Sequence, residues 1–368
     1  MSVQLNVPVP CIRTGRSWHK RVDTDEPVAK CARLSESSSD AGLLGSSPGS
    51  PVNLGPLTGT ATHQGPSRIC QFLLLPLADR SGVHSALNIE TGEELVCKVF
   101  DMGIYQEKVR AYDLLPAHGN IAGIREVILG ERKAYVFQEK DYGDMHTYVK
   151  SCRRLAEEQA ARLFQQVASA VAHCHQAGIV LGDLKLRKFV FTDEKRTRVK
   201  LEGLEDCRIL PGDDDLVSDT HGCPAYVSPE ILSGGVGVRG GGGGGGGGGG
   251  CYSGRAADAW SLGVVLYTML AGRYPFHDPD PAALFSRIRR GQYCLPEGLS
   301  AKARCLLRSL LRRDPAERLT AAEVLIHPWL SRGGRDEDAA RGGEQEVSPT
   351  DQAVPSTDSE PEDSNLFL

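Results

Sequence analysis

The residue types best suited to binding a metal ion come together at His173-Cys174-His175. Imidazole and thiolate groups are ligands that zinc prefers. These three residues lie in a stretch with helical periodicity, where consecutive side chains point in different directions. They therefore cannot converge on one ion, and we expect no metal site.

The eleven cysteines are scattered from Cys11 to Cys305, with no pair at C-x-x-C spacing. A disulfide framework or a structural zinc site would need clustered cysteines. The N-terminus shows no apolar secretory signal, and the longest apolar run, around residues 260–271, is shorter than the roughly 20 residues that cross a membrane. We therefore expect a protein of the nucleus and cytoplasm without a membrane partner.

The charge of the 368-residue chain is concentrated at its C-terminal end. The formal net charge is −5, but residues 331–368 alone hold three basic and ten acidic residues. The remainder is nearly neutral, with 39 basic against 37 acidic residues. This balance excludes a strongly basic nucleic-acid footprint, so we expect no direct nucleic-acid partner.

Composition divides the chain into three parts. Residues 1–66 are rich in Ser, Pro and Gly without lasting periodicity, residues 331–368 are similar but acidic, and both are predicted to be disordered. Residues 67–330 carry a packed pattern and form the predicted domain. A run of eleven glycines, Gly240–Gly250, predicts a Gly-rich surface insert over residues 234–250.

The apolar spacing of this domain changes near Gly143. Before it, strand-like alternation predicts strands at residues 72–75, 85–89, 94–100, 125–129 and 134–137, with one helix at 105–115. After it, helical spacing predicts helices at residues 157–175, 256–270, 282–289, 301–311 and 321–326. A small β-rich lobe followed by a helical lobe indicates an α+β, two-lobed fold.

Five short motifs in this domain resemble, in order and spacing, those of protein kinases. They are Val96-Cys97-Lys98 (V-A-I-K), residues 179–185 (H-R-D-L-K), residues 222–230 (G-T-P-x-Y-x-A-P-E), Asp258-Ala259-Trp260 (the central helix), and Asp314-Pro315 with Arg318 (the late arginine motif). The resemblance implies a two-lobed protein-kinase-like fold.

The resemblance breaks at the residues that transfer phosphate. Kinases hold Mg²⁺ with the D-F-G aspartate and with an asparagine five residues after the catalytic aspartate. Here Gly203 stands at the first position and Lys188, a cation, at the second, while Asp183 is retained. Residues 75–83 hold one glycine in place of the glycine-rich loop. We therefore expect an inactive pseudokinase that uses no metal or other cofactor.

The retained residues each allow a structural interpretation. Lys98 could contact a nucleotide phosphate weakly, or be solvated or ion-paired. Asp183 and Lys185 could be a residual base and phosphate partner, or stabilise their loop by hydrogen bonds. We expect Glu230 and Arg318 to form a structural, charge-assisted pair in the helical lobe.

Residues 184–189, 204–206 and 221–227 together resemble the Tribbles pseudokinases. Two further segments resemble motifs of that family. Ile326-His327-Pro328-Trp329-Leu330 is similar to the segment that contacts MAP kinase kinases, although H-P-W also closes the last helix of ordinary kinases. Asp351-Gln352-Ala353-Val354-Pro355 is similar to the tail motif that recruits a WD-repeat E3 ubiquitin ligase, which implies docking through Asp351, Gln352, Val354 and Pro355.

The resemblance implies an adaptor that brings the ligase to bound substrates such as CCAAT/enhancer-binding transcription factors. It also implies that the chain binds MAP kinase kinases and regulates MAP kinase signalling. Two alternatives stay open: a weakly active serine/threonine kinase that works without metal through Lys98 and Asp183, and an inhibitor that only sequesters MAP kinase kinases.

Overall fold

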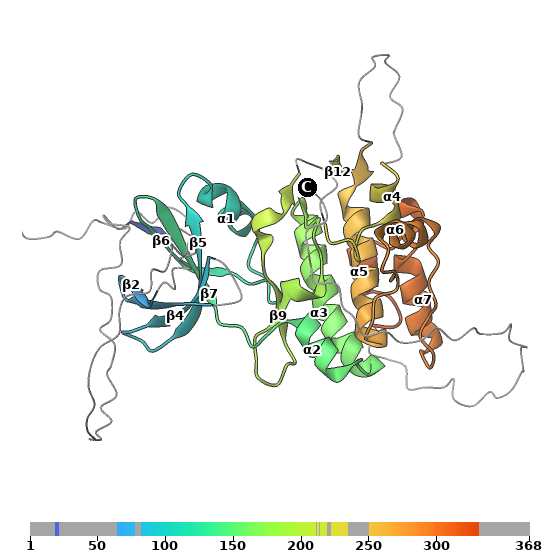
Figure 1. The fold of residues 1–368 in the computed structure, drawn as a ribbon, viewed down its shortest axis with the longest axis horizontal. Coiled ribbons are helices and arrows are strands. Elements are labelled where there is room, and N and C mark those ends of the chain that lie inside the picture. Colours follow the sequence, from blue (N-terminus) through green and yellow to red (C-terminus); the bar gives the residue numbers. More distant parts are fainter. Residues whose placement is uncertain are drawn as a thin grey trace, which may run out of the picture. The chain divides into compact units, whose positions relative to one another are not determined.

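The computed structural model describes residues 19–21, 65–77, 82–210, 212, 214–218, 222–234 and 250–330 (Figure 1). Most of the segments predicted to be disordered, 1–66 and 331–368, and most of the Gly-rich insert, 234–250, lie outside these residues. The chain divides into two compact units. The β unit comprises residues 1–105 and 124–140, and the helical unit comprises residues 106–123 and 141–368.

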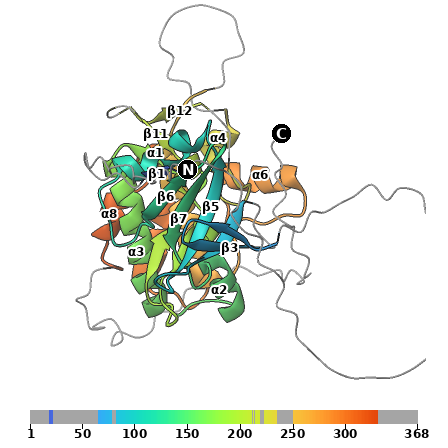
Figure 2. The same ribbon diagram turned by 90° about the vertical axis from the view of Figure 1, so that its left-hand side faces the viewer.

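The β unit is built on one seven-stranded sheet with the order β1-β6-β7-β5-β4-β3-β2. Figure 2 shows β6, β7 and β5 running side by side. All neighbours are antiparallel except β1 and β6, which are parallel. The strands are β1 (His19–Arg21), β2 (Ser67–Ile69), β3 (Phe72–Pro76), β4 (Val83–Asn88), β5 (Glu94–Asp101), β6 (Ile124–Leu129) and β7 (Lys133–Glu139).

Alternating apolar residues give this sheet a packed face. The rings of Phe72 on β3 and Phe137 on β7 stack with their centroids 4.0 Å apart. Leu74, Ala86 and Cys97 are buried in the same cluster. These positions are the inward side of the strands that the alternation predicts, and all five predicted strands are confirmed.

The helical unit holds most of the helices in the described residues, and the six predicted ones are confirmed to within two residues at either end. The helices are α1 (Tyr105–Leu114, whose first residue ends the first segment of the β unit), α2 (Met145–Cys152), α3 (Glu157–Gln176), α4 (Pro229–Leu232), α5 (Gly254–Ala271), α6 (Pro281–Arg290), α7 (Ala301–Leu310) and α8 (Ala321–Leu325). The predicted α+β fold is therefore confirmed. No helix of the described residues is long and apolar enough to span a membrane.

Short paired strands and single helical turns connect these helices. The pairs are β8 (Ile179–Val180) with β11 (Arg208–Ile209), β9 (Phe189–Phe191) with β10 (Val199–Leu201), and β12 (Leu216–Val217) with β13 (Tyr252–Ser253). The 3-10 turns are η1 (Leu186–Lys188), η2 (Leu204–Asp206) and η3 (Pro315–Glu317).

Helix α5 is the centre of the helical unit, with α3 and α7 packed against it (Figure 1). Fifteen of its eighteen residues are buried, because its sequence is apolar on all sides. Gly263 allows α7 to come close: a Cβ atom there would lie 2.8–2.9 Å from side-chain atoms of Leu310 and Leu311. Packing of these helices depends on that missing side chain.

The loop after α1 is held by a pair of stacked histidines in the helical unit. The rings of His118 and His173 lie 4.6 Å apart. The His118 ring accepts a hydrogen bond at Nδ1 from the Asn120 N–H (3.1 Å), and its Nε2 lies 3.2 Å from Ser169 Oγ. His173 Nε2 lies 3.0 Å from the Pro116 carbonyl oxygen. Burial first, and then the neighbouring His173, lower the pKa of His118.

We expect acid to destabilise the protein through His118. Because its pKa is lower in the folded state than the usual value of about 6.5, the unfolded chain binds the proton more readily, and stability falls as pH drops through that value. Thermal unfolding at stepped pH values checks this. The His118→Gln variant should lose less melting temperature on acidification than the wild type, whereas exposed His277→Gln should follow the wild type. Identical pH profiles for His118→Gln and the wild type would contradict the assignment.

Candidate functional site

The loop that follows β8 is fixed to the core by one buried carboxylate. Asp258 of α5 is 1% exposed. It accepts hydrogen bonds from the backbone N–H groups of Leu181 (2.8 Å) and Gly182 (2.9 Å), and it lies 2.9 Å from Nε2 of His175. A buried carboxylate is stable only when it is paired in this way. The backbone just before Asp183 is therefore rigidly placed.

Asp183 itself is surrounded by lysines. Its Oδ2 lies 3.1 Å from Nζ of Lys185 and 3.9 Å from Nζ of Lys188. Lys188, in η1, also donates a hydrogen bond to the carbonyl oxygen of Gly203 (2.9 Å). The ammonium group of Lys188 thus lies between Asp183, at the position of a kinase's catalytic base, and Gly203, at the position of its metal-binding aspartate.

The backbone conformation of Gly203 and its lack of a side chain both suit the contact with Lys188. Its φ of +75° is in the left-handed region that favours glycine. A Cβ atom there would lie 3.3 Å from Cδ and 3.5 Å from Nζ of Lys188. A side chain at position 203 would crowd the Lys188 side chain. The absence of a metal-binding side chain at position 203 therefore leaves space for the lysine.

The two carboxylates next to Gly203 are engaged with α1. Tyr112 donates a hydrogen bond to Oε1 of Glu205 (3.0 Å), and its hydroxyl accepts one from the Leu204 N–H (3.1 Å). Lys108 forms an ion pair with Asp206 at 2.7 Å. Tyr112 and Lys108 were not identified from the sequence, because their partners are more than 90 residues away.

The residues at this site do not fit a bound Mg²⁺ ion. Magnesium requires oxygen ligands in near-octahedral geometry. Position 203 has no side chain, position 188 has a cation, and in the described residues no group of three His, Cys, Asp or Glu side chains could hold a metal. The segment His173–His175 follows the helical geometry predicted for it: His173 contacts Pro116, His175 contacts Asp258 and Cys174 is buried.

Lys98 lies on β5 of the β unit. It pairs in register with Val83 of β4 and Val136 of β7, and its side chain is half-buried. The preceding segment places a proline, Pro76, at the end of β3, where it supplies no backbone N–H. Residues 78–81 lie outside the described residues. Nucleotide contact by Lys98 stays a prediction.

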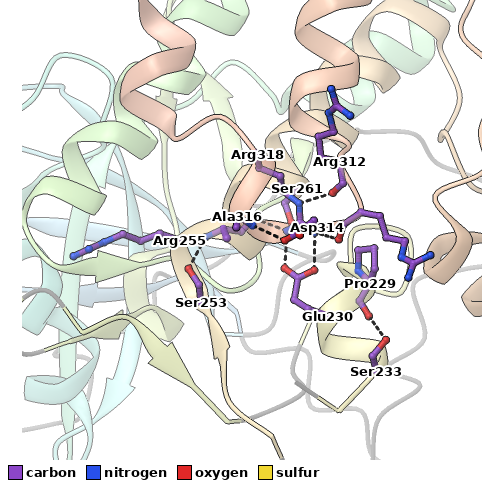
Figure 3. Close-up of polar contacts among 12 residues, drawn as sticks. Pro229, Glu230, Ser233, Ser253, Arg255, Ser261, Arg312, Asp314, Ala316 and Arg318 are labelled. Carbon is purple, nitrogen blue, oxygen red and sulfur yellow. Dashed lines mark hydrogen bonds and ion pairs between the residues drawn. The ribbon is translucent and has the colours of Figure 1, made fainter. Parts of the chain in front are cut away.

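The structure brings Glu230 and Arg318 together in a buried, bidentate ion pair (Figure 3). Both distances are 2.6 Å, and the side chains are 3% and 1% exposed. The guanidinium also donates to the carbonyl oxygens of Ala256 (3.0 Å), Arg312 (2.7 Å) and Arg313 (3.1 Å). This pair joins α4, α5 and the segment after α7.

The segment Ile326–Leu330 has an inner and an outer side. Leu330 is buried, and Trp329 is half-buried with its indole N–H donating to Glu157 of α3 (3.1 Å). Ile326 is 77% exposed, Pro328 is exposed and His327 is half-buried. The sequence did not indicate Glu157, which also binds the N–H and hydroxyl of Ser300 at the start of α7.

The predicted ligase-docking residues, Asp351, Gln352, Val354 and Pro355, lie outside the described residues.

Comparison with known proteins gives one family. Residues 80–330 match the model of the protein kinase domain. Tribbles homolog 1 of Homo sapiens is 57% identical over 354 residues, which cover 94% of this chain and 90% of that protein. Tribbles homolog 2 of Canis lupus familiaris is 52% identical over 361 residues (98% of each), and Tribbles homolog 3 of Rattus norvegicus is 44% identical over 356 residues (96% and 94%).

We expect Glu230→Gln to destabilise the protein by about 3–5 kcal/mol, because it leaves the Arg318 guanidinium buried without a counter-charge. Arg312→Gln is the matched control, since its ion pair with Glu317 is exposed and 3.6 Å long, and such pairs contribute at most about 1 kcal/mol. Urea unfolding measures both. Equal losses in the two variants would show that the buried pair has no special role.

We also expect Mg²⁺ not to strengthen any binding of ATP. Thermal shifts with ATP should be the same with and without Mg²⁺ in the wild type and in Gly203→Asp, because Lys188 still lies against position 203. The double variant Gly203→Asp, Lys188→Asn restores both types of metal ligand and is the contrast, in which Mg²⁺ should increase the shift. A clear Mg²⁺-dependent increase in the wild type would overturn this view of the site.

Proposed function

Because this chain belongs to the Tribbles family and carries a protein kinase domain, we propose that it is a catalytically inactive adaptor. In this role the helical unit holds a target protein, and the tail recruits a WD-repeat E3 ubiquitin ligase. The observation that carries the proposal is the cation at the metal position: Lys188 contacts the Gly203 carbonyl and approaches Asp183.

Charge neutralisation explains why this observation argues against catalysis. Phosphoryl transfer depends on positioning and on metal ions that neutralise the phosphate oxygens. Lys185 and Lys188 both lie close to Asp183, and these ion pairs give Asp183 a role in stabilising its loop. A metal-independent kinase that uses Lys98 and Asp183 is therefore the weaker candidate.

Tethering gives the adaptor its efficiency. About 20 residues separate Leu330 from Asp351, and if they are disordered, as their composition predicts, their root-mean-square span is about 25 Å. A ligase bound at the tail would meet a target on the helical unit at an effective concentration in the millimolar range. The targets proposed are CCAAT/enhancer-binding transcription factors, in the nucleus and cytoplasm.

Binding of MAP kinase kinases is the second proposed role, and the Ile326–Leu330 segment supports it. Trp329 and Leu330 anchor the segment, while Ile326 and Pro328 offer an apolar surface to solvent. Exposed apolar side chains held on a rigid base are typical of protein–protein contacts.

The tail motif suits an extended binding mode. Val354 and Pro355 would fill an apolar pocket of the ligase, while Asp351 and Gln352 would form hydrogen bonds at its rim. Pro355 restricts Val354 to extended backbone conformations, which lowers the ordering cost of binding.

We expect the double variant Val354→Ala, Pro355→Ala to lose ligase binding, because both groups that fill the pocket are truncated. Co-purification with the ligase is the measurement, and binding of the transcription factor should be unchanged. Neutralising Asp358, Glu360, Glu362 and Asp363 should have a smaller, salt-dependent effect, since exposed charges mainly steer association. Wild-type recovery of the ligase with the double variant would remove the main support for an adaptor.

Deletion of residues 348–368 separates the two proposed roles. An adaptor should stop promoting degradation of its target without this segment. A chain that only sequesters MAP kinase kinases should keep its full effect on signalling.

A further inference from the structure

The stretch that forms α6 and α7 is strongly basic. Residues 281–313 contain eight arginines and lysines against one carboxylate, Glu297. All eight cationic side chains are exposed. The formal net charge of these 33 residues is therefore +7, whereas residues 1–330 as a whole are nearly neutral.

Four of these arginines lie near the ends of the two helices, around Tyr293. Arg290 ends α6, and Arg313 lies close to the turn at Gly291, because a Cβ atom at Gly291 would be 3.8 Å from Arg313 Cβ. Arg308 and Arg312 act electrostatically on the phenol of Tyr293, although burial is the larger effect and raises the pKa of Tyr293 to about 12. We call Arg290, Arg308, Arg312 and Arg313 the arginine cluster.

The arginine cluster is poorly neutralised by its own surroundings. Within the described part of the chain, Arg290, Arg308 and Arg313 form no ion pair, and Arg312 has only the exposed, 3.6 Å contact with Glu317. By contrast, Arg287 pairs with Asp278 at 3.2 Å, and Arg289 donates to the Leu232 carbonyl oxygen. Guanidinium groups collected in this way repel each other and favour a bound anion.

The residues around the arginine cluster indicate which kind of anion it would bind. Exposed carboxylates flank it at Glu297, Asp314 and Glu317, and would repel a polyanion that extends past the four arginines. A nucleic acid is bound tightly through more phosphate contacts than four, on the order of 6–10. A membrane-binding surface would add exposed apolar side chains, and residues 281–313 include none of the large exposed hydrophobics of the described chain.

We propose that the arginine cluster is a docking surface for an acidic segment of a partner protein. Carboxylates pair with guanidinium forks bidentately, and a short run of Asp and Glu residues needs no more cationic contacts than the four arginines supply. This goes beyond the adaptor role, because the surface binds its partner whether or not the tail engages a ligase.

The test measures binding of a fluorescein-labelled octaglutamate peptide to the full chain by fluorescence anisotropy. The double variant Arg308→Gln, Arg313→Gln should bind the peptide about tenfold more weakly, and added salt should remove the difference. The matched control, Lys195→Gln with Arg196→Gln on the β9–β10 connection, makes the same change in net charge away from the cluster and should keep wild-type affinity. Equal weakening in both variants would overturn the proposal.

Further arms separate other occupants. Duplex DNA or phosphatidylserine vesicles that bind more tightly than the peptide, and lose binding in the Arg308→Gln, Arg313→Gln variant, would overturn a protein partner. Neutralising the acids of residues 344–363 tests whether the tail of this chain occupies the cluster. If the tail does, its neutralisation frees the arginines, and a tenfold gain in peptide affinity would overturn a protein partner.

A charge-reversed variant distinguishes loss of binding from loss of folding. If Arg308→Glu, Arg313→Glu melts like the wild type and binds octalysine in place of octaglutamate, the cluster is the binding surface. If it melts normally and binds neither peptide, the proposal fails.

Discussion

The need to pair every charge that helix α5 buries is the constraint on which the helical unit depends. Asp258 within this helix is stable only because two backbone N–H groups and His175 surround it. Arg318, whose guanidinium lies 5.1 Å from the centre of the Trp260 ring, is stable only with Glu230. These contacts fix the loop before Asp183 and the segment after α7.

The degree of burial distinguishes the kinase motif residues that this chain keeps from those that it has replaced. Asp258, Glu230 and Arg318 are buried, and replacing any of them would leave an uncompensated charge. Positions 188 and 203 are less enclosed, and a new local contact, from Lys188 to the Gly203 carbonyl, can replace the metal there. The buried pairs of the kinase-like scaffold therefore do not depend on the residues found at positions 188 and 203.

Periodicity allowed the sequence to predict the long elements, five strands and six helices, because regular burial on one face repeats within each segment. It missed β1 and β2, which have three residues each, and α2, at whose start the Thr147 N–H donates a capping hydrogen bond to the Asp144 carboxylate. It also missed the partners of Glu205, Asp206 and Trp329, since Tyr112, Lys108 and Glu157 are brought close only by the fold. Motif spacing identified which catalytic residues are replaced, whereas the contact that occupies their place required coordinates.

The contact between Trp329 and Glu157 has a mechanical consequence. Any tension applied to residues 331–368 enters the helical unit at buried Leu330 and is shared by Trp329 with the first turn of α3. The Trp329 ring also lies edge-on to Phe164, with the centroids 6.3 Å apart, so the attachment covers the first two turns of the 20-residue helix, whose other end leads to β8 and Asp183. A pull applied at Leu330 would therefore load the start of α3 before it reached the loop around Asp183.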